Sequence, residues 1–160
     1  MDLASQLAET NSERKVRASP FFLHGDRLLL GADTLIEIDG DVFGKPAGPD
    51  SARRMLARLS GREHKVLTGV CLSGLDKIGK NVVITTCSES VVTFRSLSPR
   101  DINSYLRSGE WQGKAGAYAV QGLAGEFVAK LSGDLDNVIG LPLTSLRGLL
   151  RQYFSHCTFR

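Results

Sequence analysis

Three short stretches of the sequence place charged and amide side chains where they could act on a phosphate ester. They are GADT at 31–34, GKP at 44–46 and KAGAYAVQG at 114–122. Asp33 follows an apolar run that starts at Leu28, and an ionised carboxylate is placed in a protein core only at large cost. We therefore expect Asp33 at the end of a strand, facing a cleft, with a turn-capping aspartate as the alternative.

Lysine and glutamine side chains complete this set. Lys45 precedes Pro46, which imposes an extended backbone on the lysine and so directs its ammonium along a defined vector. Lys114 adds a second charge, glycines leave nearby backbone amides uncovered, and the Gln121 amide can both donate and accept. A carboxylate that binds a divalent cation or deprotonates water, beside cations that offset phosphoryl charge, indicates hydrolysis of a phosphoanhydride. An ordinary solvated Lys45 and a close-packed glycine turn without a ligand are the alternatives.

Other candidate motifs fit such chemistry less well. The stretch GLDKIGKN at 74–81 lacks the hydroxyl residue and the following helix that a phosphate-binding P-loop requires, so we expect a hairpin turn. His156 and Cys157 are neighbours in the terminal tail and are poorly placed to act as a nucleophile pair. His24 and His64 have no metal-ligand partner at helical spacing, and we expect surface or hydrogen-bonded histidines.

The elements that must position these residues alternate between helical and extended patterns. Ser98, Pro99 and Asp101 form a clear helix start, with a hydroxyl N-cap, a proline at the first helical position and an acid that reaches back. Helices are expected at about 3–16, after Pro49 to Gly61, from Ser98 to Gly109 and around 146–153, and strands at 27–38, 63–73, 81–95 and 127–131, with a hairpin turn at Asp39-Gly40. The sequence thus predicts one α/β domain over residues 1–160, with a mixed sheet flanked by helices.

Composition limits the class of protein. The 20 basic and 17 acidic residues give a net charge of +3, and no basic run exceeds a pair, which argues against a nucleic-acid groove. The three cysteines are far apart and form no CxxC pair, so neither a disulfide framework nor a zinc site is expected, and a reducing compartment fits. No window approaches the roughly 20 apolar residues of a membrane span. We therefore expect a cytoplasmic protein without nucleic-acid or membrane partners.

Five blocks of the sequence, taken in order, resemble the Maf family of nucleoside triphosphate pyrophosphatases. They are GADTLIEIDGDVFGKP, ARRMLARLSGREHKVLTGV, VTFRSLS, KAGAYAVQG and LDNVIGLPL. The resemblance runs from about Leu3 to Leu150. It implies an elongated two-lobed Maf/ITPase-like fold with a central cleft, a homodimer, and a house-cleaning role in nucleotide metabolism. The implied reaction cleaves a nucleoside triphosphate between its α and β phosphates with a divalent cation, Mg²⁺ or Mn²⁺.

The same resemblance implies roles for four of the candidate residues. Asp33 takes the position of the proton acceptor that activates water and also contacts the metal, and Lys45 would contact the triphosphate. Lys114 is a further substrate-binding candidate on account of its charge. Thr34 and Gln121 fall on positions associated with base selection in the subgroup that prefers dTTP and UTP. A glutamine amide suits uracil and thymine, which present a carbonyl beside the N3 hydrogen. The sister subgroup, directed at 7-methylguanosine triphosphate, carries a different block there.

One departure from the family pattern bears on activity. Members usually begin with a strand, a SxSPRR-like loop that meets phosphate, and a glutamate used in metal binding, and this sequence starts after them. The RASP at 17–20 is not expected to replace that loop. Missing arginines would remove bidentate phosphate clamps, and a missing strand would leave a neighbouring strand edge unpaired. We therefore expect an N-terminally truncated Maf-like domain. The alternatives are a catalytically impaired, nucleotide-binding or division-regulating protein, and a structural dimer module without a ligand.

Overall fold

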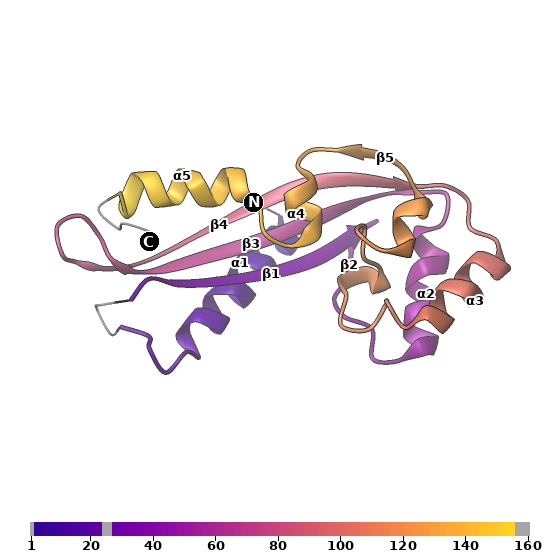
Figure 1. Ribbon diagram of the computed structural model, residues 1–160, viewed down its shortest axis with the longest axis horizontal. Helices are drawn as coiled ribbons and strands as arrows, with labels where there is room; N and C mark the ends of the chain where they lie inside the picture. The colour runs from indigo at the N-terminus through magenta and orange to yellow at the C-terminus, as the bar shows by residue number, and fades with distance from the viewer. Residues whose placement is uncertain (1, 24–26, 156–160) are drawn as a thin grey trace.

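Two long strands define the shape of the molecule in the computed structural model, which describes residues 2–23 and 27–155. Strands β3 (Glu63–Leu75) and β4 (Asn81–Phe94) run along most of its length, with α2 and α3 at one end and α5 along the other half (Figure 1). The other elements are α1 (Leu3–Arg17), β1 (Leu29–Ile38), β2 (Asp41–Phe43), α2 (Pro49–Leu59), α3 (Pro99–Ser108), the 3₁₀ turns η1 (Ala115–Ala117) and η2 (Leu123–Phe127), β5 (Val128–Ser132), α4 (Leu135–Ile139) and α5 (Leu143–Tyr153).

The strands form one five-stranded sheet in the order β2-β1-β3-β4-β5. Every neighbouring pair is antiparallel, so the expected mixed sheet is corrected to an antiparallel one, while the α/β class is confirmed. The physical reason is that short turns join β1 to β2 and β3 to β4, and a short turn can link only antiparallel strands. Asp39 and Gly40 form the first turn with φ values of 54° and 82°, the left-handed geometry predicted from the Asp-Gly pair.

Strand β1 has a free edge along much of its length. Its C-terminal residues 36–38 pair with β2, whereas residues 29–35 pair only with β3 among the described strands. Ile38 flanks a two-residue hairpin turn, so the even-numbered residues direct their amides and carbonyls toward β2. Beyond the end of β2, the main-chain groups of Ala32 and Thr34 therefore have no partner strand on this side among the described residues, and the Ala32 carbonyl oxygen accepts from Lys15 instead.

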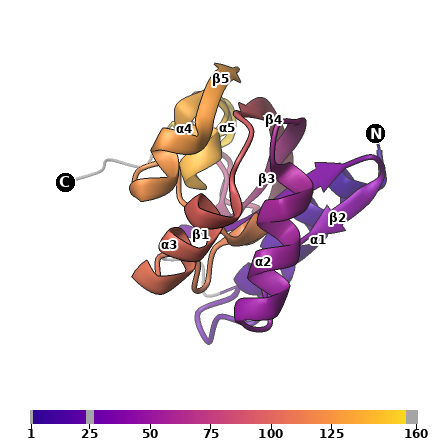
Figure 2. The same ribbon diagram turned by 90° about the vertical axis from the view of Figure 1, so that its right-hand side faces the viewer.

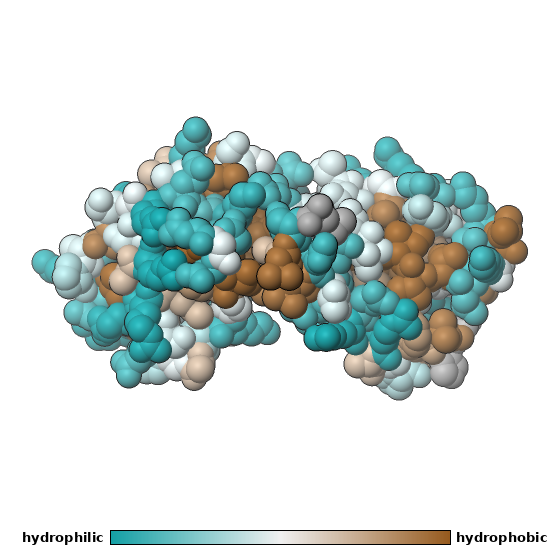
Figure 3. Space-filling model, turned by 180° about the vertical axis from the view of Figure 1, so that it is seen from behind, coloured by the Kyte–Doolittle hydropathy of each residue, from teal (hydrophilic) through white to brown (hydrophobic). Residues whose placement is uncertain are grey.

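Two hydrophobic cores lie along the sheet. The larger core packs α2 and α3 against one end of the sheet, and the smaller core packs α5 on Val70 and Leu72 toward the other end. The space-filling view narrows between these two ends, so the expected elongated, two-lobed shape is confirmed (Figure 3). Such a shape places the middle of the sheet between the lobes.

Helix α1 crosses the sheet on the face opposite to α4 and α5 (Figure 2). Two strand glycines allow the close approach. A Cβ at Gly31 would lie 2.6 Å from the Ser12 carbonyl oxygen, and a Cβ at Gly69 would lie 2.3 Å from the Ala8 carbonyl group. A side chain at either position would clash with α1, so these glycines allow the helix to lie directly on β1 and β3.

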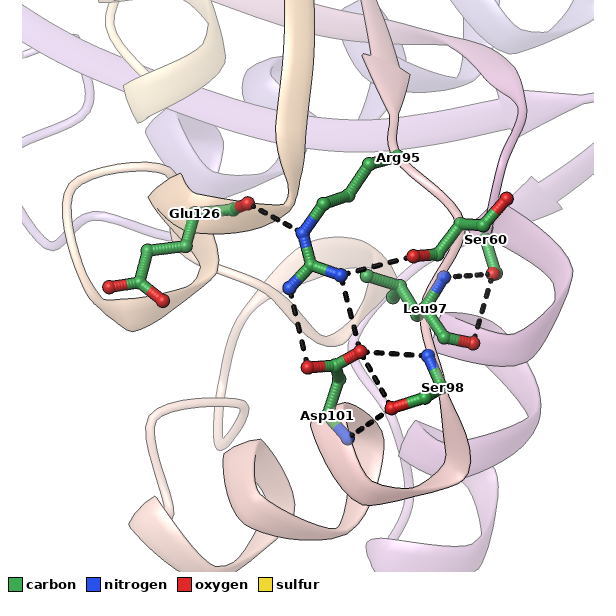
Figure 4. Close-up of polar contacts among 7 residues, drawn as sticks. Ser60, Arg95, Leu97, Ser98, Asp101 and Glu126 are labelled. Carbon is green, nitrogen blue, oxygen red and sulfur yellow. Dashed lines mark hydrogen bonds and ion pairs between the residues drawn. The ribbon is translucent and has the colours of Figure 1, made fainter.

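Helix α3 begins with the predicted capping box. The Ser98 hydroxyl accepts from the Asp101 amide at 3.2 Å, and the Asp101 carboxylate accepts from the Ser98 amide at 2.8 Å. Arg95 pairs with the same carboxylate and donates through Nε to the Glu126 carbonyl oxygen (Figure 4). Hydrogen bonds from Arg95 and Ser98 hold the pKa of Asp101 far below its usual range.

The remaining elements mostly match the sequence pattern. Residues 74–81 form the expected hairpin turn, in which the Asp76 carboxylate accepts from the amides of Ile78 and Lys80 at 3.0 and 2.9 Å. Helix α4 has only five residues and was not predicted. No helix in the described part of the chain combines the length and the apolar character needed to cross a membrane.

Candidate active site

A pocket of about 240 Å³ opens beside the free edge of β1, between the two lobes. Its lining includes each residue that the sequence singled out: Asp33, Thr34, Lys45, Lys114 and Gln121. They come from β1, the segment after β2 and the glycine-rich stretch before β5, so the fold brings together residues far apart in the chain. This placement makes a shared site possible, and the individual roles stay predictions.

Asp33 does not lie at a strand end, which corrects both the expected position and the turn-capping alternative. It sits in the middle of β1, opposite Gly69 of β3. The position is tolerable because the neighbouring edge is open and because α1 supplies partners. The Lys15 ammonium donates to Asp33 Oδ1 at 2.6 Å, and the Asn11 amide donates to Oδ2 at 2.9 Å. The Asp33 side chain is 16% exposed, so a ligand can still reach it.

Lys15 and Asn11 are site residues that the sequence did not reveal. They lie four residues apart on one face of α1, and Lys15 also donates to the Ala32 carbonyl oxygen at 2.7 Å. Their spacing was visible in the sequence, but only the crossing of α1 over Gly31 and Gly69 decides that this face meets Asp33. Lys15 itself lines the pocket.

Lys45 and Lys114 reach the pocket from two connected loops. The Gly116 amide donates to the Gly44 carbonyl oxygen at 3.0 Å, which ties the two lysine-bearing segments together. Gly116 has φ of 63°, and a Cβ there would lie 2.6 Å from Ile36, so the turn requires glycine. Within the described part of the chain, neither ammonium forms an ion pair. Both charges are therefore free to meet an anionic ligand.

The loop that carries Gln121 is held by a carboxylate outside the pocket. Glu110 accepts from the Leu123 amide at 2.8 Å, and a Cβ on Gly122 would lie 2.1 Å from the same carboxylate oxygen. The Gly122 amide donates to the Ala119 carbonyl oxygen at 3.1 Å and closes the turn around Gln121. The side-chain amide of Gln121 has no hydrogen-bond partner among the described residues, which leaves it available to a ligand.

Tyr118 forms part of the apolar wall and is oriented by a buried histidine. His64 Nε2 lies 2.9 Å from the Tyr118 hydroxyl, which confirms the hydrogen-bonded alternative for this histidine. Burial lowers the pKa of His64 to about 4, so its ring is neutral near pH 7. His24, His156 and Cys157 lie outside the described residues.

The acidic residues of the site are few. Asp33 is the one carboxylate in the described pocket lining, and the described ranges contain no group of three or more His, Cys, Asp or Glu side chains that could hold a metal ion by itself. Arg17, the first residue of RASP, instead pairs with Glu13 and does not line the pocket. The site therefore combines a single carboxylate with three lysines, a set suited to a polyanionic ligand.

Comparisons with known proteins agree with the residue pattern. The family model for Maf-like proteins matches residues 1–153. A dTTP/UTP pyrophosphatase from Syntrophomonas wolfei is 43% identical over 153 residues, covering 93% of this chain and 77% of the relative. Proteins of the same name from Clostridioides difficile and Symbiobacterium thermophilum are also 43% identical, over 82% and 95% of this chain and 66% and 75% of the relatives. The chain thus spans two thirds to about three quarters of the length of these relatives.

Proposed function

This chain belongs to the family of Maf-like proteins, and on that premise we propose that it is a nucleoside triphosphate pyrophosphatase acting on dTTP and UTP. The observation that supports the proposal best is the gathering of Asp33, Lys15, Lys45, Lys114 and Gln121 around one pocket. The three ammonium groups are opposite in charge to a triphosphate, and Gln121 supplies an amide for the base. The products are the nucleoside monophosphate and pyrophosphate.

In the proposed reaction Asp33 is the general base. It takes a proton from a water molecule, whose oxygen attacks the α phosphorus while the bond from that phosphorus to the bridging oxygen breaks. The lysines offset the negative charge that develops on the departing pyrophosphate. Because Lys15 already contacts Asp33 at 2.6 Å, it can move to a phosphate oxygen with little displacement.

We also propose a divalent cation, Mg²⁺ or Mn²⁺, as cofactor. Mg²⁺ is commonly held by one or two carboxylates together with substrate phosphates, so a pocket lined by the single carboxylate Asp33 fits a cation that is completed by the triphosphate. The cation would polarise phosphoryl oxygens and add positive charge to the site. Asp33 would hold it, with Asn11 still orienting the carboxylate.

The test is pyrophosphate release from dTTP, UTP, CTP, GTP, ATP and 7-methylguanosine triphosphate, with Mg²⁺ or Mn²⁺, beside Asp33→Asn. We expect dTTP and UTP to be the best substrates. The amide keeps the shape of Asp33 and cannot accept the proton, so the rate should fall by a factor on the order of 10² or more. An unchanged rate would remove Asp33 from the mechanism, and nucleotide binding without turnover would contradict the proposed activity.

We propose that the enzyme works as a homodimer in the cytoplasm, without nucleic-acid or membrane partners. Apolar side chains on α4 and the start of α5 support the dimer, since Leu135, Ile139 and Leu143 are 49%, 42% and 37% exposed. The free cysteines Cys71 and Cys87 are consistent with a reducing compartment. Light scattering on the purified chain should give the mass of a dimer, and a monomer at all concentrations would contradict this assembly.

A further inference from the structure

A directed chain of hydrogen bonds runs from the pocket into the middle of the sheet. The Thr68 hydroxyl donates to the main-chain carbonyl oxygen of Asn137 at 2.9 Å. The hydroxyls of Thr34 and Thr68 lie 2.9 Å apart, so one of them donates to the other. A threonine hydroxyl has a single hydrogen, and that of Thr68 is already used by Asn137. The donor in the second bond is therefore Thr34.

This direction decides what Thr34 can offer a ligand. Its hydroxyl hydrogen points to Thr68, so the lone pairs that remain on Oγ1 can only accept. Thr34 lines the pocket and is partly exposed, whereas Thr68 is fully buried behind it. The pocket thus presents an acceptor of fixed polarity at this point.

Asn137 makes the direction hard to reverse. Its side chain is fully buried, and Nδ2 donates to the Val66 carbonyl oxygen and to Ser90 Oγ, each at 3.0 Å. Ser90 Oγ in turn donates to the Asp134 carbonyl oxygen at 3.0 Å, which secures the start of α4. Turning the Thr68 hydroxyl toward Thr34 would break its bond to the Asn137 main-chain carbonyl oxygen, which would keep only the Gly140 amide at 3.1 Å, so the network would lose one hydrogen bond.

We propose that Thr68 and Asn137 are positioning residues that make Thr34 an obligate acceptor and thereby select uracil and thymine over cytosine. This inference rests on the proposed function. Uracil and thymine carry a hydrogen on N3, which an acceptor can bind, whereas cytosine presents an unprotonated N3. Gln121 alone would discriminate less well between uracil and cytosine, because rotating its side-chain amide exchanges the donor and the acceptor. A site whose polar groups cannot adapt rejects the mismatched base, since both partners lose a hydrogen bond.

The experiment compares Thr68→Val with Thr68→Ser. Valine keeps the shape and removes the hydroxyl, which frees Thr34 to donate, so the ratio of kcat/KM for UTP to that for CTP should fall on the order of tenfold. Serine keeps the hydroxyl and should keep the ratio. Thr86→Val on β4 is the matched control, because that hydroxyl has no hydrogen bond within the described residues and Thr86 does not line the pocket.

Binding of UMP and CMP, measured by calorimetry, provides a readout independent of turnover. The preference for UMP should weaken in Thr68→Val, and in a Thr34→Val background the Thr68→Val change should leave the preference as it is. A selective wild-type enzyme whose Thr68→Val variant keeps its preference would overturn the inference and leave the proposed function standing. Loss of preference in Thr68→Ser as well would also overturn it. A wild-type chain that neither binds nor hydrolyses these nucleotides would overturn both proposals.

Discussion

The carboxylate of Asp33 is restrained by two different donors. Asn11 supplies a neutral amide to one oxygen, and Lys15 supplies a charged ammonium to the other. The Lys15 side chain is 50% exposed, so it can leave Asp33 without unpacking the core. One lysine can therefore orient the general base in the free protein and bind phosphate once substrate arrives.

Replacing Lys15 with methionine tests this double role. The variant keeps much of the apolar stem and loses the charge, so we expect kcat/KM for dTTP to fall about tenfold or more and to depend less on ionic strength. Lys77→Met is the control, since Lys77 is an exposed lysine in the β3–β4 turn away from the pocket. Steady-state kinetics at low and high salt measure the effect. A Lys15→Met rate within twofold of the control would show that Lys15 has no part in the reaction.

The sequence predicted only part of the site, and the reason is physical. Asp33 and Gln121 lie in short blocks whose residue types suggest chemistry without knowledge of the fold. Lys15 and Thr68 carry no such local signal. Their place depends on how closely α1 crosses β1 and on a strand pairing between residues 34 positions apart. Only the tertiary structure fixes such contacts.

Among the elements, the loop around Gln121 has the clearest link to function. Glu110, just beyond the end of α3, accepts from the Leu123 amide, and Arg95 donates to the Glu126 carbonyl oxygen at 3.0 Å (Figure 4). Both contacts lie on the C-terminal side of Gln121, in the 3₁₀ turn η2. The position of the Gln121 amide thus depends on α3 and on the end of β4.

Glu110→Ala should release this loop. The Leu123 amide loses its acceptor, so its hydrogen exchange should accelerate, and KM for UTP should rise about tenfold because binding must then order the segment. Glu126→Ala is the matched control, since Glu126 contributes its main-chain carbonyl and its carboxylate points away from Arg95 (Figure 4). Exchange measured by mass spectrometry tests the first effect and kinetics the second. If the two variants show the same hydrogen exchange and the same KM for UTP, Glu110 does not hold the loop in place.

Elements with strong local signals were predicted best. The capping box at Ser98 and the turn at Asp39-Gly40 specify their own geometry, and both occur as expected. Helix α4 was not predicted because five residues are too few to show a helical periodicity. Its position depends on the buried contacts of Asn137. The pairing of β1 with β3 also had no local signal, because β2 and α2 lie between these strands in the sequence.

At the scale of the whole molecule, β3 and β4 join the two lobes. The same strands contribute Val66 and Phe94 to the larger core and Val70 to the smaller one. The pocket lies where β2 ends and the edge of β1 becomes free, and Val66 and Tyr118 of the larger core form part of its wall. His64 supports this wall, because it packs edge-on against Phe94 and Tyr118 at centroid distances of 5.0 and 5.6 Å.

Protonation of His64 should make the whole fold sensitive to acid. Burial lowers its pKa from 6.5 to about 4, so below the unfolded value the unfolded chain binds the proton more readily and the free energy of unfolding falls. The loss should be about 2 kcal/mol at about pH 5. His64→Gln retains a group able to hydrogen-bond Tyr118 and cannot titrate, so urea unfolding at about pH 7.5 and about pH 5 should show this loss in the wild type alone. If both proteins lose equal stability, a different group is responsible for the acid sensitivity.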